Sequence, residues 1–166
     1  MSYARSGAMI VTATIVMFGM FGLMYLNTYA LDHVWFSQTR AWMAVVMGAA
    51  MAAVMLAFML NMYNSKAANL AIVAASIVLF AGALFLVRSQ EAVSDVSYMK
   101  AMIPHHSIAI MTSRRAHIRD PRVRKLADGI IEAQVREIAE MENLIADLEA
   151  KPVPADAPDL APVPPQ

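Results

Sequence analysis

The chain has 166 residues, of which 59% are hydrophobic and 16% are charged, and this balance indicates a membrane protein rather than a soluble domain. Its 13 basic and 13 acidic side chains leave no net charge that would attract nucleic acid, so we expect no nucleic-acid partner. The absence of cysteine excludes disulfides and thiolate metal sites.

Three stretches without charged side chains occupy the first half of the chain, at residues 6–31, 41–65 and 67–87. Because a membrane-spanning helix needs about 20 apolar residues, each stretch is long enough to cross a bilayer. Aromatic residues lie near the ends of the stretches, as is typical of a membrane–water interface; they are Tyr25, Tyr29, Trp35, Trp42 and Tyr63. We therefore expect residues 1–88 to form an anchor of three transmembrane helices in contact with membrane lipid.

The second stretch carries a methionine at every fourth position. These residues are Met43, Met47, Met51, Met55 and Met59. Steps of four residues drift by about 40° per repeat around a helix, and methionine packs well between membrane helices, so packing is the favoured interpretation of this stripe. A pathway for a metal ion is the alternative.

The chain after the third stretch has the composition of water-soluble helices. Ser94 or Asp95 can cap a helix that runs to about Ile118. Asp120 followed by Pro121 is a typical start of a second helix, with the aspartate as the cap and the proline in the first turn. These signals predict two helices outside the membrane.

The second of these helices repeats apolar side chains at alternating steps of three and four, which predicts a seam that packs against another helix. The seam consists of Ala127, Ile131, Gln134, Ile138, Met141, Ile145 and Leu148. Because a hairpin of two helices is too small to bury a stable core alone, we expect two chains to pair through the seam as a homodimer with a four-helix bundle.

The predicted fold class is all-α, with three transmembrane helices followed by a helical hairpin that dimerisation completes. Residues 89–150 should form a helical metal-binding domain. Residues 151–166 contain six prolines and should form a disordered tail, because proline interrupts both helix and sheet.

The segment MKAMIPHHSIAIM combines three of the chain's 15 methionines with two of its four histidines. Met99, Met102 and His106 recur at steps of three and four, which places them on one face of a helix. His105 lies three residues after Met102, so that Met102 sits between the two imidazoles. His117 follows His106 by three helical turns on the same face.

Thioether and imidazole donors without thiolates select soft metal ions, Cu(I) most of all, over zinc, magnesium or calcium. Pro104 cannot donate to the carbonyl of Lys100, so the helix should kink or restart beside the histidines. The motifs of zinc hydrolases and of di-iron bundles, H-E-x-x-H and E-x-x-H, do not occur. The predicted copper site consists of Met99, Met102, His105, His106, His117 and Met141, the last from the seam of the following helix. Ordinary packing of these side chains is the alternative.

The run YMKAMIPHHSIAI, followed by DPRVRKLADGIIEAQVREIAEM, resembles the domain-of-unknown-function family 305 over roughly Val93 to Leu148. The resemblance implies a ferritin-like bundle of four helices, in a family with members linked to copper binding and copper tolerance in the bacterial envelope. The family's recurring positions are matched by Met99, Met102, His105, His106, Gln134, Glu137 and Met141. Many members carry a methionine seven residues after the first histidine, where this chain has Thr112, so His117 or a partner chain would have to compensate.

These patterns together predict a membrane-anchored copper-binding protein of copper tolerance or homeostasis, and not an enzyme. We expect it in the bacterial inner membrane, with the amino terminus inside and the C-terminal domain in the periplasm. The basic residues near the spans do not select this orientation, which follows from copper chemistry and from the resemblance. Two alternatives are a copper transport subunit that uses the methionine stripe of the second stretch, and a structural or assembly protein without metal.

Overall fold

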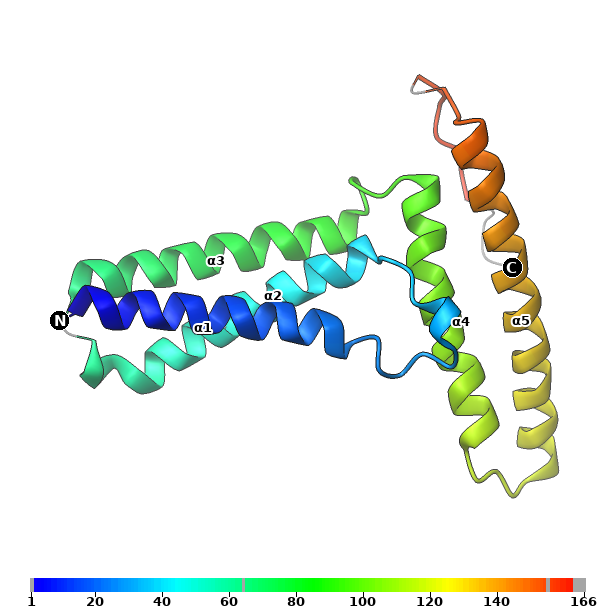
Figure 1. Cartoon of the computed structure of the whole chain (residues 1–166), viewed down its shortest axis with the longest axis horizontal. Coiled ribbons are helices and arrows are strands. Elements are labelled where there is room, and N and C mark those ends of the chain that lie inside the picture. Colours follow the sequence, from blue (N-terminus) through cyan, green and yellow to red (C-terminus); the bar gives the residue numbers. More distant parts are fainter. Residues whose placement is uncertain (1, 64, 155, 163–166) are drawn as a thin grey trace.

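The computed structural model describes residues 2–63, 65–154 and 156–162. Within these residues the chain forms helices and no strand, which confirms the predicted all-α class. The helices are α1 (Ser2–Leu23), η1 (Leu31–His33), α2 (Gln38–Met59), η2 (Leu60–Met62), α3 (Lys66–Ser89), α4 (Asp95–Arg115) and α5 (Pro121–Ala150). The first three α-helices form one bundle, and α4 and α5 form a hairpin that lies across one end of it (Figure 1).

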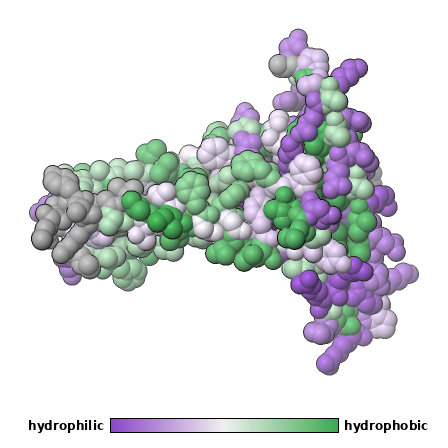
Figure 2. Space-filling model, viewed as in Figure 1, coloured by the Kyte–Doolittle hydropathy of each residue, from purple (hydrophilic) through white to green (hydrophobic). Residues whose placement is uncertain are grey.

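Two helices, α2 and α3, are long and apolar enough to cross a membrane. Two of the three predicted spans are therefore matched, and the first predicted span falls partly on residues whose side chains lie outside the described part of the structure. Within the described side chains, α1 contributes only Thr14–Leu23 as an apolar helix, which is shorter than the about 20 residues that a hydrocarbon core requires. The space-filling view shows mostly hydrophobic surface along the bundle and hydrophilic surface over much of the hairpin (Figure 2).

Local capping signals set the boundaries of the hairpin helices. The Ser94 hydroxyl accepts a hydrogen bond from a backbone N–H of the first turn of α4, and the Asp120 carboxylate does the same for α5, with Pro121 as its first residue. Both predicted starts are confirmed. Helix α4 ends at Arg115, earlier than predicted, because Ala116 turns into an extended conformation with φ −66° and ψ 137°.

The seam of α5 packs against α4 of the same chain. Ile138 and Ile145 are buried in one cluster with Met99, Ile103 and Ile110 of α4. The seam predicted from the 3/4 spacing therefore exists, but the expectation that it forms the dimer interface is wrong for these isoleucines, since α4 already covers them.

The loop between α1 and α2 fixes the hairpin to the bundle. The Tyr29 backbone N–H donates to Ser107 Oγ on α4 at 2.7 Å, and His33 Nδ1 lies 2.9 Å from the same oxygen. Ser107 is fully buried. The Lys100 ammonium lies 5.7 Å from the centre of the Trp35 ring. The membrane-type helices and the hairpin are therefore joined by side-chain contacts as well as by the chain between α3 and α4.

Candidate metal centre

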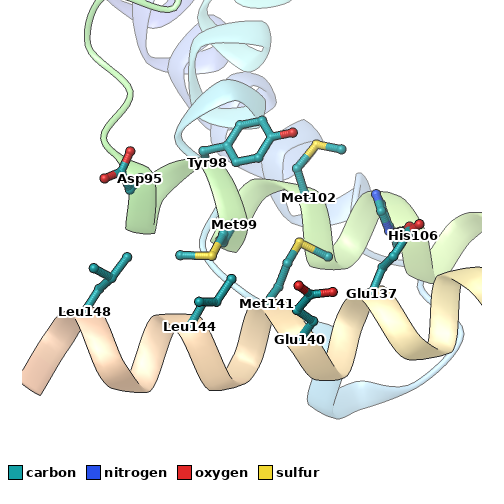
Figure 3. Close-up of a pocket in the computed structure, with 10 residues that line it drawn as sticks. All are labelled: Asp95, Tyr98, Met99, Met102, His106, Glu137, Glu140, Met141, Leu144 and Leu148. Carbon is teal, nitrogen blue, oxygen red and sulfur yellow. Dashed lines mark ion pairs between the residues drawn. The ribbon is translucent and has the colours of Figure 1, made fainter. Parts of the chain in front are cut away.

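A pocket of about 440 Å³ opens between α4 and α5 and is lined by three of the hairpin's four methionines. Its lining includes Met99, Met102 and His106 from α4 and Met141 from α5. We call it the α4–α5 pocket. Four of the six predicted ligands thus line one pocket. In Figure 3, Met99 and Met141 lie between the two helices, whereas Met102 points away from α5 on the side of Tyr98.

The spacing along α4 explains why these side chains meet. Met99, Met102 and His106 recur at steps of three and four on a helix that runs through Pro104 without interruption, so the predicted restart does not occur. Met99 is also part of the buried core, whereas Met102 and Met141 are half-buried at the pocket. The pocket therefore lies directly beside the packed core of α4 and α5, and Met99 belongs to both.

The other two predicted ligands lie elsewhere. His105 is exposed and does not line the pocket; its ring centre lies 6.2 Å from that of His106. His117 is exposed in the turn after α4, because the helix ends at Arg115. The placement of His117 on the same helical face as His106 is therefore wrong.

His106 faces Glu137 across the α4–α5 contact. Its Nδ1 lies 3.1 Å from Glu137 Oε2, and its side chain is only 14% exposed. The separation is that of an ion pair, but the geometry is not that of a hydrogen bond, and the buried Nδ1 has no hydrogen-bond partner among the described residues. Gln134 Nε2 donates to the same Glu137 oxygen at 3.2 Å.

Burial lowers the pKa of His106 below the ordinary value for histidine. The nearby Glu137 carboxylate raises it and His105 lowers it, and burial is the largest of the three effects. The imidazole is therefore neutral at neutral pH and carries a free nitrogen lone pair that can bind a metal ion.

Residues 86–161 match the family described as "Domain of unknown function (DUF305)". This region contains the whole hairpin and the α4–α5 pocket, so the predicted domain family is confirmed for it. A relative is "Uncharacterized protein L153" of Acanthamoeba polyphaga mimivirus, 39% identical over 64 residues, which are 37% of this chain and 42% of that protein. The chain therefore covers less than half the length of that relative. No solved structure matches the chain.

The donor atoms of the DUF305 region favour a soft metal ion. No group of three histidine, cysteine, aspartate or glutamate side chains that could hold a metal ion occurs in the part of the chain that the structure describes. Zinc, magnesium and calcium rely on such groups. The pocket instead places the thioethers of Met99, Met102 and Met141 beside His106, and thioether and imidazole are donor types that Cu(I) prefers.

Spacing did not indicate the acidic rim of the pocket. Asp95, Glu137 and Glu140 line it beside the sulfur atoms. Glu137 had been indicated by the family resemblance alone, although its position four residues before Met141 places it on the same face of α5. That spacing was the available signal for its location.

An arrangement of serine, histidine and aspartate also occurs, but it is not a hydrolytic site. Ser107 Oγ lies 2.9 Å from His33 Nδ1, and His33 Nε2 lies 4.0 Å from Asp32. Because Ser107 is fully buried and accepts the Tyr29 N–H, no substrate can reach it. These contacts hold the α1–α2 loop on α4.

The methionine stripe of α2 is divided between packing and exposure. Met55 and Met59 pack against Leu56 and Tyr63. Met51 is 38% exposed on the surface of the bundle. Packing thus accounts for part of the stripe.

Proposed function

We propose that the protein is a membrane-anchored copper-binding protein and that the α4–α5 pocket holds Cu(I). The observation that supports this most is the convergence of three thioethers and one imidazole on one pocket, from two helices. Among the described residues no three histidine, aspartate or glutamate side chains are grouped so that they could hold a metal ion. Copper is a ligand to be bound here, and no catalytic step is proposed.

Each side chain has a distinct role in this proposal. Met102 and Met141 supply half-buried thioethers from opposite helices, and His106 supplies the imidazole. Met99 supplies a third sulfur at the buried side of the α4–α5 pocket, where it also packs in the core. Glu137 lies 3.1 Å from Nδ1 of His106, so the other ring nitrogen, Nε2, is the one available to the metal, with Glu137 as an outer-shell carboxylate. His105 and His117 are not needed.

The anchor in this proposal is the helical pair α2 and α3, with the bacterial inner membrane as the expected location. Two spans return the chain to one side, which agrees with the contact of the α1–α2 loop with α4. We place the hairpin on the outer side, where copper tolerance would require it. Protease added to intact spheroplasts should cut the proline-rich tail at 151–166. If the protease cut the tail only in inverted vesicles, the hairpin would lie on the cytoplasmic side, opposite to the orientation proposed.

The proposal is tested by metal selectivity of the full chain in detergent micelles. Cu(I) supplied anaerobically should bind in competition with a chelator, and an excess of zinc should not displace it. Failure to bind Cu(I) would favour a structural or assembly protein. Copper flux across proteoliposomes would favour a transport subunit that uses the methionine stripe of α2, whereas binding without flux agrees with tolerance or homeostasis.

A further inference from the structure

Helix α5 carries a second apolar surface that is largely exposed, with Ala133 half-buried. Its members recur at steps of three and four and are Val123, Leu126, Ile130, Ala133 and, three turns further on after two glutamates, Leu144. We call this surface the α5 stripe. Leu126 is 65% exposed and Val123 is 49% exposed. At 100° per residue, the stripe lies roughly a quarter-turn from the face that packs on α4.

The N-terminal half of the stripe is shaped for a close neighbour. A shallow groove of about 500 Å³ lies over Leu126, Gly129, Ile130 and Ala133. A β-carbon added at Gly129 would meet no atom within 4 Å, so the space above this part of the helix is open. Small residues at such a position let another helix approach closely.

The charged side chains that line the two pockets beside the stripe differ in sign, although Glu132 also lies in its N-terminal half and Arg136 in its C-terminal half. Arg122 and Lys125 line the groove at its N-terminal half. Glu137 and Glu140 line the α4–α5 pocket at its C-terminal half. A second α5 packed in parallel would therefore place like charges together, whereas an antiparallel α5 would place opposite charges together.

The orientation of the hairpin permits an antiparallel pair in one membrane. Helices α4 and α5 lie across the end of the bundle that contains α2 and α3 (Figure 1). Two chains inserted in the same direction are related by a two-fold axis along the membrane normal. Such an axis makes two helices that lie in the membrane plane antiparallel.

We propose that a second copy of this chain binds the α5 stripe through its own α5, antiparallel and crossing at Ala133. In this arrangement Ala133 meets its own counterpart, and Leu126 and Lys125 of one copy lie near Glu140 of the other. Because Glu140 and Leu144 also line the α4–α5 pocket, the second copy covers the mouth of that pocket. The pairing requires no metal, so it stands or fails independently of copper binding.

The cysteine-free sequence allows a direct test with single cysteines in the full chain. In vesicles of neutral phosphatidylcholine, Ala133→Cys should form a covalent dimer with a short bis-maleimide. Val135→Cys is the matched control, because it is 55% exposed and lies 200° further around α5. Equal or weaker cross-linking of Ala133→Cys would overturn the proposal.

The direction of the helices is tested by mixing two differently tagged variants. Leu126→Cys should cross-link to Glu140→Cys, and Leu126→Cys should not cross-link to itself. Cross-linking of Leu126→Cys to itself would show a parallel pair and contradict the proposal. Lys125→Glu should weaken the cross-linking of Ala133→Cys, and the added change Glu140→Lys should restore it. Loss of cross-linking in vesicles with anionic lipid would assign the stripe to the lipid surface instead.

Discussion

The Nδ1 atom of His106 on α4 lies 3.1 Å from the Glu137 carboxylate on α5 and, although it is buried, makes no hydrogen bond with any residue that the structure describes. This relationship joins the two helices at the end of the pocket that the methionines line. Nδ1 of His106 faces the Glu137 carboxylate, and Nε2 is the nitrogen that is available to a metal ion.

Replacing Glu137 by glutamine should weaken Cu(I) binding. Carboxylates that orient a metal-binding histidine typically contribute about 10–100-fold to affinity, and we expect a loss in that range. Chelator competition under anaerobic conditions measures it. Glu140→Gln removes a carboxylate from the same pocket and is the matched control. Equal losses in the two variants would show a general effect of charge and contradict a specific role for Glu137.

The pH dependence of Cu(I) affinity should report the environment of His106. Its pKa lies below the ordinary value for histidine, chiefly because the ring is buried, so the folded protein takes up this proton at lower pH than the unfolded chain. Affinity should therefore hold as pH falls to about 6.5 and decrease only below it, as protons compete for the imidazole. A titration from about pH 8 to about pH 5 measures the midpoint. A midpoint above the ordinary histidine pKa would contradict the assignment.

The same pKa shift has a consequence for stability. Between the ordinary and the lowered pKa the unfolded chain binds more protons at this residue than the folded chain, so the contribution of His106 to stability decreases as pH falls through that window. In Glu137→Gln the carboxylate that raises the pKa of His106 is lost. The pH midpoints of Cu(I) affinity and of the loss of stability should therefore both move to lower pH.

The α4–α5 core should depend on the seam isoleucines. Ile145 is 2% exposed, and Ile145→Ala should destabilise the hairpin by about 2–5 kcal/mol, because it removes buried methyl groups and leaves a cavity. Hydrogen exchange of the α4 and α5 amides in the full chain measures the change. Val135→Ala, at an exposed position of the same helix, should change stability by less than about 0.5 kcal/mol. Similar protection in both variants would mean that α5 packs through another face.

Removing the Ser107 hydroxyl should loosen the α1–α2 loop. Ser107→Ala leaves the Tyr29 N–H and His33 without their buried partner, which costs about 1–3 kcal/mol for an unsatisfied group. Hydrogen exchange of residues 29–36 should increase. The control is Thr112→Ala, because the Thr112 hydroxyl bonds carbonyls of its own helix. Unchanged protection of the loop in Ser107→Ala would show that other contacts hold it.

Local signals predicted much of the hairpin. Ser94 and Asp120 act within their own first turns, so the starts of α4 and α5 could be identified from a few neighbouring residues. The helical period likewise placed Met99, Met102 and His106 on one face.

Other features depend on contacts between distant parts of the chain. The 3/4 spacing of α5 identified a buried face but not its partner, which is α4 of the same chain. His117 was placed by helical spacing on a helix that had already ended, because no proline or glycine marks the turn at Ala116. The proximity of Glu137 to His106 follows from how α4 and α5 pack, which a single sequence does not contain.

Anaerobic chelator competition with two variants of the full chain shows directly whether thioether and imidazole side chains of the α4–α5 pocket bind Cu(I). Met102→Leu keeps the shape and apolarity of the side chain and removes its sulfur, and His106→Ala removes the imidazole. Loss of an outer-shell partner lowers metal affinity by about 10–100-fold, and each of these two changes should lower Cu(I) affinity by at least as much. Met111→Leu, on the same helix but outside the pocket, should leave Cu(I) affinity unchanged. If Met102→Leu and His106→Ala both bind Cu(I) as tightly as the parent chain, the pocket is not a copper site.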